Sequence, residues 1–283
     1  MENYFRRLLL TSELHDAFTF AQVHQEIADL EQELVEHFNE HGPMNPHYIY
    51  LLAELNGAYA RAQNTERGLE VAQQIYQSSQ ILHGEKSELT IEALMGLGFS
   101  YLDDNQVGEA QSIATMLLRM PWGGDEGPSF DLYIDALALQ ADIKHHHGEY
   151  DDELILRKHI LAMLTELSGA TSGLTILARA AIGFCLEQMG NYQEALDHYL
   201  IVRSYLDYDS AFASEAEKIG LMVHIGRCYQ KLGETEHSRV IYRWAHRQAN
   251  RHYGKVSPLS KKTAAILRHF EQSYQGTEQP SHH

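Results

Sequence analysis

The sequence predicts an all-α fold built from stacked helical pairs, and three observations support this prediction. The first is a repeat of about 42 residues, because five segments align on Tyr59, Tyr101, Lys144, Leu186 and Tyr229. A fixed period of this size is typical of a repeat array. The second is that the 283 residues include only 6 prolines and few runs rich in Val, Ile or Thr, which favours helix over sheet. The third is an apolar share of 44%, which is ordinary for a folded protein.

Each repeat reads as a helix, a tight turn and a second helix. A small residue recurs in the middle of the first helix, as Gly98, Gly183 and Gly226. Glycine costs a helix about 1 kcal/mol relative to alanine, so its recurrence indicates that another helix approaches closely there. Another glycine follows Gly183 and Gly226 by seven residues, at Gly190 and Gly233. Glycine at this position suits a left-handed turn that ends a helix.

The second helix of each repeat carries a small residue where it is expected to cross the first helix. This residue is Ala110 in the second repeat and Ala195 in the fourth. The third repeat departs from the pattern, because Glu153 occupies the same position. Apolar residues at spacings of three and four fill the remaining helical positions.

The two ends of the chain are expected to close the array. Residues 1–43 read as an atypical helical pair, residues 44–256 as five repeats, residues 257–276 as a polar capping helix and residues 277–283 as a disordered tail. In the leading pair, Phe20, Val23, Ile27, Leu30 and Leu34 form a heptad seam. This seam either packs onto the first repeat or forms a homodimer contact.

The motif Ile182-Gly183, Leu186, Gly190-Asn191-Tyr192, Ala195 and Tyr199 resembles the tetratricopeptide repeat family, and the match covers roughly residues 45–276. The usual family period is 34 residues. The longer period, with the links His83-Gly84-Glu85-Lys86 and Tyr253-Gly254-Lys255, is similar to the repeat of kinesin light chains. The resemblance implies a right-handed α-α superhelix of about twelve helices. It also implies noncovalent binding of a protein or peptide in a concave groove.

In this family the first helix of each repeat lines the groove, so the resemblance assigns groove positions to this chain. These positions are Glu54, Arg61, Met95, Phe99, Asp103, Asp142, His146, Phe184, Gln188, His224, Arg227 and Lys231. The alternative is that Phe99 and Phe184 are core residues and the charges only solvate the face. The paired Asn residues with which the family clamps a terminal carboxylate have no counterpart here.

The net charge of −17 argues against nonspecific binding to nucleic acid or to an anionic membrane. Arg227 and Lys231 share one face of a helix and form a rare basic spot, which favours a partner with an acidic or carboxylate-bearing segment. No apolar stretch is long enough to span a membrane or to act as a signal peptide, which favours a cytoplasmic location. Cys185 and Cys228 occupy equivalent repeat positions, which should lie too far apart for a disulfide, so both are expected to be buried thiols.

Other motifs give no evidence of catalysis. The run His145-His146-His147 cannot converge on one ion, because consecutive helical residues point about 100° apart, so no metal site and no cofactor are predicted. Trp122 lies in an irregular link and is expected either to contact a partner or to fold back onto the repeats. No phosphate-binding loop, zinc helix or nucleophile elbow is present. The sequence therefore predicts a non-enzymatic scaffold. The alternatives are a peptide-sensing regulator that acts through a protein and, less favoured, an enzyme with an unrecognised site.

Overall fold

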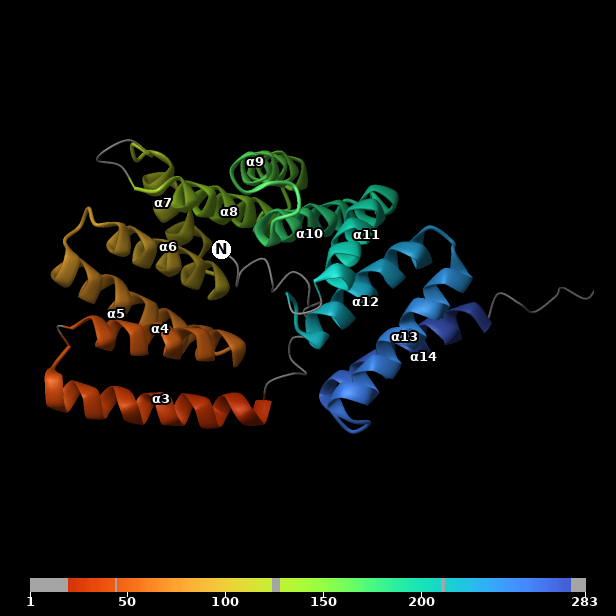
Figure 1. The fold of residues 1–283 in the computed structure, drawn as a ribbon, viewed down its shortest axis with the longest axis horizontal. Helices are drawn as coiled ribbons and strands as arrows, with labels where there is room; N and C mark the ends of the chain where they lie inside the picture. Colours follow the sequence, from red (N-terminus) through yellow and green to blue (C-terminus); the bar gives the residue numbers. More distant parts are fainter. Residues whose placement is uncertain (1–19, 44, 124–127, 210–211, 276–283) are drawn as a thin grey trace, which may run out of the picture. The chain divides into compact units, whose positions relative to one another are not determined.

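The computed structural model describes residues 20–43, 45–123, 128–209 and 212–275, and all of their regular structure is helical (Figure 1). The first part of the predicted leading pair, residues 1–19, and the tail 277–283 lie outside the described residues. Twelve α-helices, α3 to α14, occupy the described part of the chain. The prediction of an all-α fold of about twelve helices is therefore confirmed.

The helices group into two compact units, residues 19–156 and residues 157–283, which are described separately as the first and second unit. The first unit contains α3 (Phe20–His41), α4 (Pro46–Arg61), α5 (Thr65–His83), α6 (Glu88–Asp103), α7 (Val107–Leu118) and α8 (Phe130–His146). Helix α9 (Tyr150–Ser168) crosses the boundary. The second unit contains α10 (Gly173–Gln188), α11 (Tyr192–Tyr208), α12 (Glu215–Lys231), α13 (Thr235–Tyr253) and α14 (Pro258–Gln275).

Helices that follow one another in the chain pack against one another within each unit. In the first unit these contacts run from α3 to α8, and α6 also contacts α8 directly. In the second unit they run from α10 to α14. This sequential packing is the arrangement expected of a helical solenoid, in which each repeat contacts its neighbours.

The turn inside each repeat has the left-handed backbone that the sequence predicts. The φ angles at this position are 55° at Gln63, 60° at Asn105, 71° at Gly148, 80° at Gly190 and 81° at Gly233. Glycine adopts this conformation without steric cost, and a side chain does so with difficulty. The two repeats with Gln or Asn at this position therefore have a less favourable turn than the other three.

The recurring small residues mark close contacts between helices, as predicted. A Cβ atom added to Gly183 would lie 2.7 Å from Tyr199 Cε1, and one added to Gly226 would lie 2.6 Å from Tyr242 Cε1. The crossing residue Ala195 is fully buried. A tyrosine ring from the second helix therefore rests directly on the glycine of the first helix in both of the last two repeats.

A second glycine motif links alternate repeats. Gly84, Gly169 and Gly254 have φ angles of 82°, 88° and 80°, and each is followed by the pattern Gly-x-x-Ser-x-x-Thr or Ser. In the first two links the threonine hydroxyl donates to the carbonyl oxygen of the glycine, at 2.8 Å from Thr90 and from Thr175. The three glycines are 85 residues apart, and each follows a second helix of 19 residues. The links after α7, of 12 residues, and α11, of 17 residues, lack this motif.

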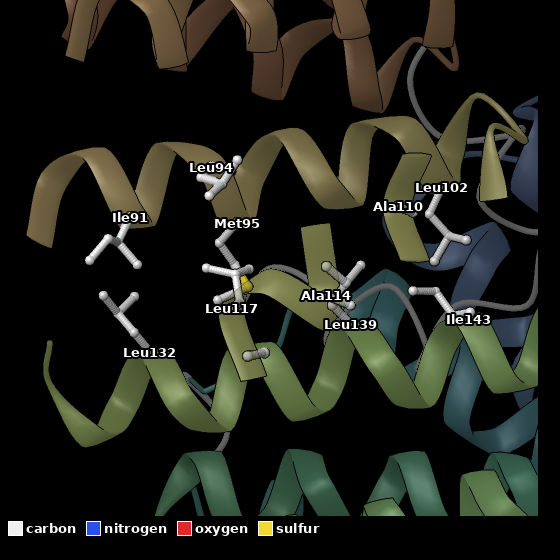
Figure 2. Close-up of a cluster of buried hydrophobic side chains, with 11 residues drawn as sticks. Ile91, Leu94, Met95, Leu102, Ala110, Ala114, Leu117, Leu132, Leu139 and Ile143 are labelled. Carbon is white, nitrogen blue, oxygen red and sulfur yellow. The ribbon is translucent and has the colours of Figure 1, made fainter. Parts of the chain in front are cut away.

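A core cluster of the first unit is formed where α6, α7 and α8 meet (Figure 2). Ile91 and Met95 of α6 point toward α8, from which Leu132 and Leu139 point back. Trp122 folds back onto this cluster, and its Nε1 donates to the carbonyl oxygen of Leu117 at 3.0 Å. Of the two alternatives for Trp122, the structure shows the folded-back one.

The heptad seam of α3 packs onto the first repeat. Val23 is 4% exposed, and Ile27, Leu30 and Leu34 pack against buried residues of α4 and α5. The side chain of Phe20 lies outside the part of the chain that the structure describes. The described part of the seam is thus covered by its own chain, so a homodimer formed through it would have to displace these contacts.

Candidate functional site: a basic cleft beside the last repeat

Four of the predicted groove residues in the first unit are exposed. Glu54, Arg61, Asp103 and His146 lie on the first helices of three repeats. Arg61 forms an ion pair with Glu26 of α3, so its charge is shared with a neighbouring carboxylate. The other three predicted groove residues of this unit, Met95, Phe99 and Asp142, are buried or half-buried.

Met95 and Asp142 lie in the interior of the first unit, and Phe99 packs against its core. Met95 is 4% exposed and Asp142 is 5% exposed. Phe99 is half-buried and packs against the α6–α8 core. In this arrangement Met95 and Asp142 are inaccessible to a partner, and for Phe99 the core interpretation fits the packing better.

The histidine run at the end of α8 diverges, as its helical spacing predicts. His145 Nδ1 lies 2.8 Å from an oxygen of Glu153, which is fully buried at the position where other repeats have a small residue. Burial and the neighbouring His145 and His147 lower the pKa of His146, whereas the charge of Asp103 on α6 raises it. The predicted groove residues Asp103 and His146 are therefore close enough to interact.

The five predicted groove residues of the second unit have different exposures. Gln188 and Lys231 are exposed, and the side chain of Arg227 is 32% exposed. Phe184 is half-buried and meets the ring of His224 edge-on, with centroids 5.9 Å apart. His224 itself is 1% exposed and lies in the interior. Arg227 is therefore placed between the interior and the surface.

Arg227 lines a cleft of about 480 Å³ whose walls come from α12, α13 and α14. The lining residues are Arg227, Gln230, Tyr242, Lys262, Ala265, Ile266, His269 and Phe270. Three of them, Arg227, Lys262 and His269, carry or can gain a positive charge. Ile266 and Phe270 supply apolar surface. The cleft can therefore accept an anionic group beside an apolar one.

The inner end of Arg227 is held by a buried carboxylate. Arg227 Nη1 donates to one oxygen of Glu187 at 2.9 Å. The other oxygen of Glu187 accepts from the hydroxyl of Tyr199 at 2.9 Å and lies 2.8 Å from His224 Nδ1. The side chain of Glu187 is 3% exposed. We call Glu187, Tyr199, His224 and Arg227 the buried network.

The buried network lowers the pKa of Glu187 and raises the pKa values of Tyr199 and of the nearby Cys228. Burial alone would raise the pKa of Glu187, but the hydrogen bond from His224 and the charges of His224 and Arg227 together hold it below its ordinary value. Burial and the negative charge of Glu187 raise the pKa of the Tyr199 hydroxyl well above its usual range. The same two causes raise the pKa of the Cys228 thiol to about 12. Glu187 is thus ionised and both other groups are neutral at physiological pH.

Lys262 and His269 were missed by sequence reasoning, because α14 was interpreted only as a polar cap. A signal was available: Gly276 follows Gly233 by 43 residues, which marks the helix before it as the counterpart of a first helix. A first helix would line the groove in the same way as α12. Glu187 was missed because its partner His224 is 37 residues away.

Cys185 and Cys228 are buried thiols rather than disulfide partners, as the sequence predicts. Among the described residues, no group of three or more His, Cys, Asp or Glu side chains is arranged to hold a metal ion. None of the described helices is both long enough and apolar enough to cross a membrane.

Solved structures resemble this chain in fold. The structure of BtubC (BKLC) from P. vanneervenii matches with a TM-score of 0.61 and 11% sequence identity, covering 83% of this chain and 93% of that one. A putative kinesin light chain with nearly identical TPR-like repeats from Podosopora anserina matches with a TM-score of 0.48 and 16% identity, covering 67% of this chain and 89% of that one. No protein-family model matches the sequence, and no curated protein matches it.

The structural neighbours are therefore tetratricopeptide-repeat and kinesin-light-chain-like proteins, at low sequence identity. The predicted resemblance is confirmed at the level of fold, which is that of a helical repeat solenoid.

Proposed function

We propose that this chain is a non-enzymatic scaffold that binds a protein or peptide, and that the cleft between α12 and α14 anchors an acidic segment of that partner. Helical repeat folds of this kind generally present surfaces for protein binding. The exposed groove residues of the first unit, Glu54, Arg61, Asp103 and His146, are proposed as a separate contact surface of that unit.

The observation that carries this proposal is the chemistry of the cleft. Arg227, Lys262 and His269 converge on one cavity in a protein whose net charge is −17. Ile266 and Phe270 lie beside them, so a bound segment can bury an apolar side chain while its carboxylate meets the basic rim. Buried apolar anchors supply most of the affinity of protein interfaces, and rim charges supply specificity and association rate.

The test compares two neighbouring lysines of α14 that differ in position but not in charge. Lys262 lines the cleft, whereas Lys261 is exposed outside it. Lys262→Glu and Lys261→Glu change the net charge of the chain equally. The probes are two fluorescein-labelled hexapeptides in which Glu alternates with Leu or with Ser, measured by fluorescence polarisation at low and high salt.

The Glu-Leu peptide is expected to bind more tightly than the Glu-Ser peptide, because only Leu can use the apolar surface. Lys262→Glu should weaken binding of both peptides about tenfold or more at low salt, and Lys261→Glu should change it less than about twofold. Equal losses in the two variants would show that only the overall charge of the chain matters. The cleft would then not be the binding site.

A further inference from the structure

Arg227 belongs to both the cleft and the buried network, so the charge that faces a ligand depends on the network behind it. Its Nη1 donates to Glu187, while its side chain reaches the cleft. The carboxylate of Glu187 cancels part of the positive charge of Arg227. Any change that neutralises Glu187 from the interior would therefore raise the positive potential of the cleft.

His224 is placed to neutralise Glu187 from the interior. Its Nδ1 lies 2.8 Å from a Glu187 oxygen, and a carboxylate oxygen can only accept, so Nδ1 carries a hydrogen in both protonation states of the ring. The second proton must then bind at Nε2. This atom is buried and has no hydrogen-bond partner among the described residues. A proton at Nε2 places a full charge beside Glu187 without breaking the existing hydrogen bond.

The other titratable groups that interact with Glu187 do not change charge near neutral pH. From α11, Tyr199 has a pKa well above its usual range because it is buried beside Glu187. From α12, burial raises the pKa of Cys228 to about 12, and from α13, burial raises that of Tyr242 beyond the physiological range. From α10, Glu187 remains ionised. Histidine is the side chain that ordinarily changes charge between pH 5 and 8.

We propose that His224 regulates the cleft: when His224 gains a proton it takes over the neutralisation of Glu187, and the charge of Arg227 becomes available to an anion bound in the cleft. With neutral His224, the charges of Glu187 and Arg227 sum to zero. With protonated His224, the network carries one net positive charge. Anion affinity therefore rises as pH falls, and by reciprocity a bound anion increases the proton affinity of His224. This inference rests on the proposed function of the cleft.

The experiment must separate His224 from His269, because His269 lines the cleft and would raise anion affinity at low pH by itself. All measurements therefore use His269→Gln as the background. The second protein is His224→Gln in that background, in which the glutamine amide can still donate to Glu187 but cannot gain a charge. The probe is sulfate, which keeps its charge between pH 5.5 and 8, and ionic strength is held constant. Circular dichroism confirms that both proteins fold.

In the background protein, sulfate affinity is expected to rise about tenfold more between pH 8 and pH 5.5 than in the protein that also carries His224→Gln. The comparison removes the contribution of the other histidines, which both proteins share. Equal pH dependence in the two proteins would overturn the regulation by His224. It would leave the cleft intact as a binding site, because sulfate would still bind.

A second measurement does not depend on the stability of the His224→Gln protein. Nitrogen-15 NMR of the histidine rings follows the protonation of His224 in the His269→Gln background, with and without saturating sulfate. Sulfate should move the titration of His224 to higher pH, and an unmoved titration would overturn the coupling. If sulfate does not bind at any pH, and Lys262→Glu leaves peptide binding unchanged, the proposed cleft itself fails and the coupling fails with it.

Discussion

The ring of Tyr199 rests on the backbone of Gly183, where a Cβ atom would come within 2.7 Å of Tyr199 Cε1. Tyr199 cannot easily move away, because its hydroxyl donates to the buried carboxylate of Glu187. A side chain at position 183 would therefore be forced against a ring that is fixed at both ends.

Gly183→Ala is accordingly expected to lower the stability of the second unit by about 1–3 kcal/mol, the usual cost of overpacking a core. Gly96→Ala is a matched control, because Gly96 lies in a helix and a Cβ atom there would meet nothing within 4 Å. Alanine is the better helix former, so the control should be neutral or stabilising by up to about 1 kcal/mol. Thermal unfolding followed by circular dichroism compares the two, and a stabilising Gly183→Ala would contradict the close contact.

Ala195→Arg should destabilise the protein strongly, because Ala195 is fully buried where α11 crosses α10. A long charged side chain there must either displace the packing, at a cost of about 1–3 kcal/mol or more, or remain buried without a partner. Gln193→Arg introduces the same side chain at an exposed position of the same helix. An unchanged melting temperature for Ala195→Arg, measured beside this control, would show that the repeat register is wrong.

Glu187→Gln should lower stability at pH 7 by about 1.5–3 kcal/mol, the contribution of hydrogen bonds to a charged group. The folded protein holds the pKa of Glu187 below its ordinary value, so the unfolded chain binds the proton more readily. The stabilisation is therefore complete above the unfolded pKa of about 4.3 and is lost as pH falls through the lower folded pKa.

Urea denaturation of both proteins at several pH values tests this dependence. The difference between wild type and Glu187→Gln should persist down to about pH 5, begin to shrink below the unfolded pKa of about 4.3, and be lost only below the lower folded pKa, where the folded wild-type carboxyl group is protonated as well. A difference that stays constant down to acidic pH would mean that Glu187 is not ionised in the folded protein.

Removing residues 258–283 should lower solubility, because α14 covers the end of the array. Leu259 and Phe270 are each 1% exposed and pack against α12 and α13, among them Tyr242 and Ala245. Solenoid ends need such a cap to hide the apolar face of the last repeat. The truncated protein should bind a hydrophobic dye and aggregate at concentrations at which the full chain is monodisperse. A variant that ends at Gln275 retains α14 and should behave as the full chain does.

The sequence predicted those features that are repeated along the chain. Left-handed turns recur at Gly190 and Gly233, and close helix contacts recur at Gly183 and Gly226. Each repeat has the same backbone geometry at these positions, so the same residue recurs there. Periodicity makes such positions visible even in a single sequence.

The candidate site was less predictable because its residues are not repeated. Arg227 was assigned to the groove from its repeat position, but its contact with Glu187 joins residues 40 positions apart in neighbouring repeats. His224 was assigned to the same surface, although its helical position places it in the interior. Contacts between different repeats depend on how two helices meet, which a repeat alignment does not specify.

The alternating links at Gly84, Gly169 and Gly254 have a consequence for the way the array can be lengthened or shortened. Because the three links are 85 residues apart, the smallest segment that restores the same local geometry contains two repeats rather than one. Deleting a single repeat would join a short second helix to a link built for a long one. Deleting two consecutive repeats would instead join a 19-residue second helix, through a link with the same glycine motif, to a first helix that already follows such a link. Two repeats are therefore the natural module for engineering shorter or longer forms of this protein.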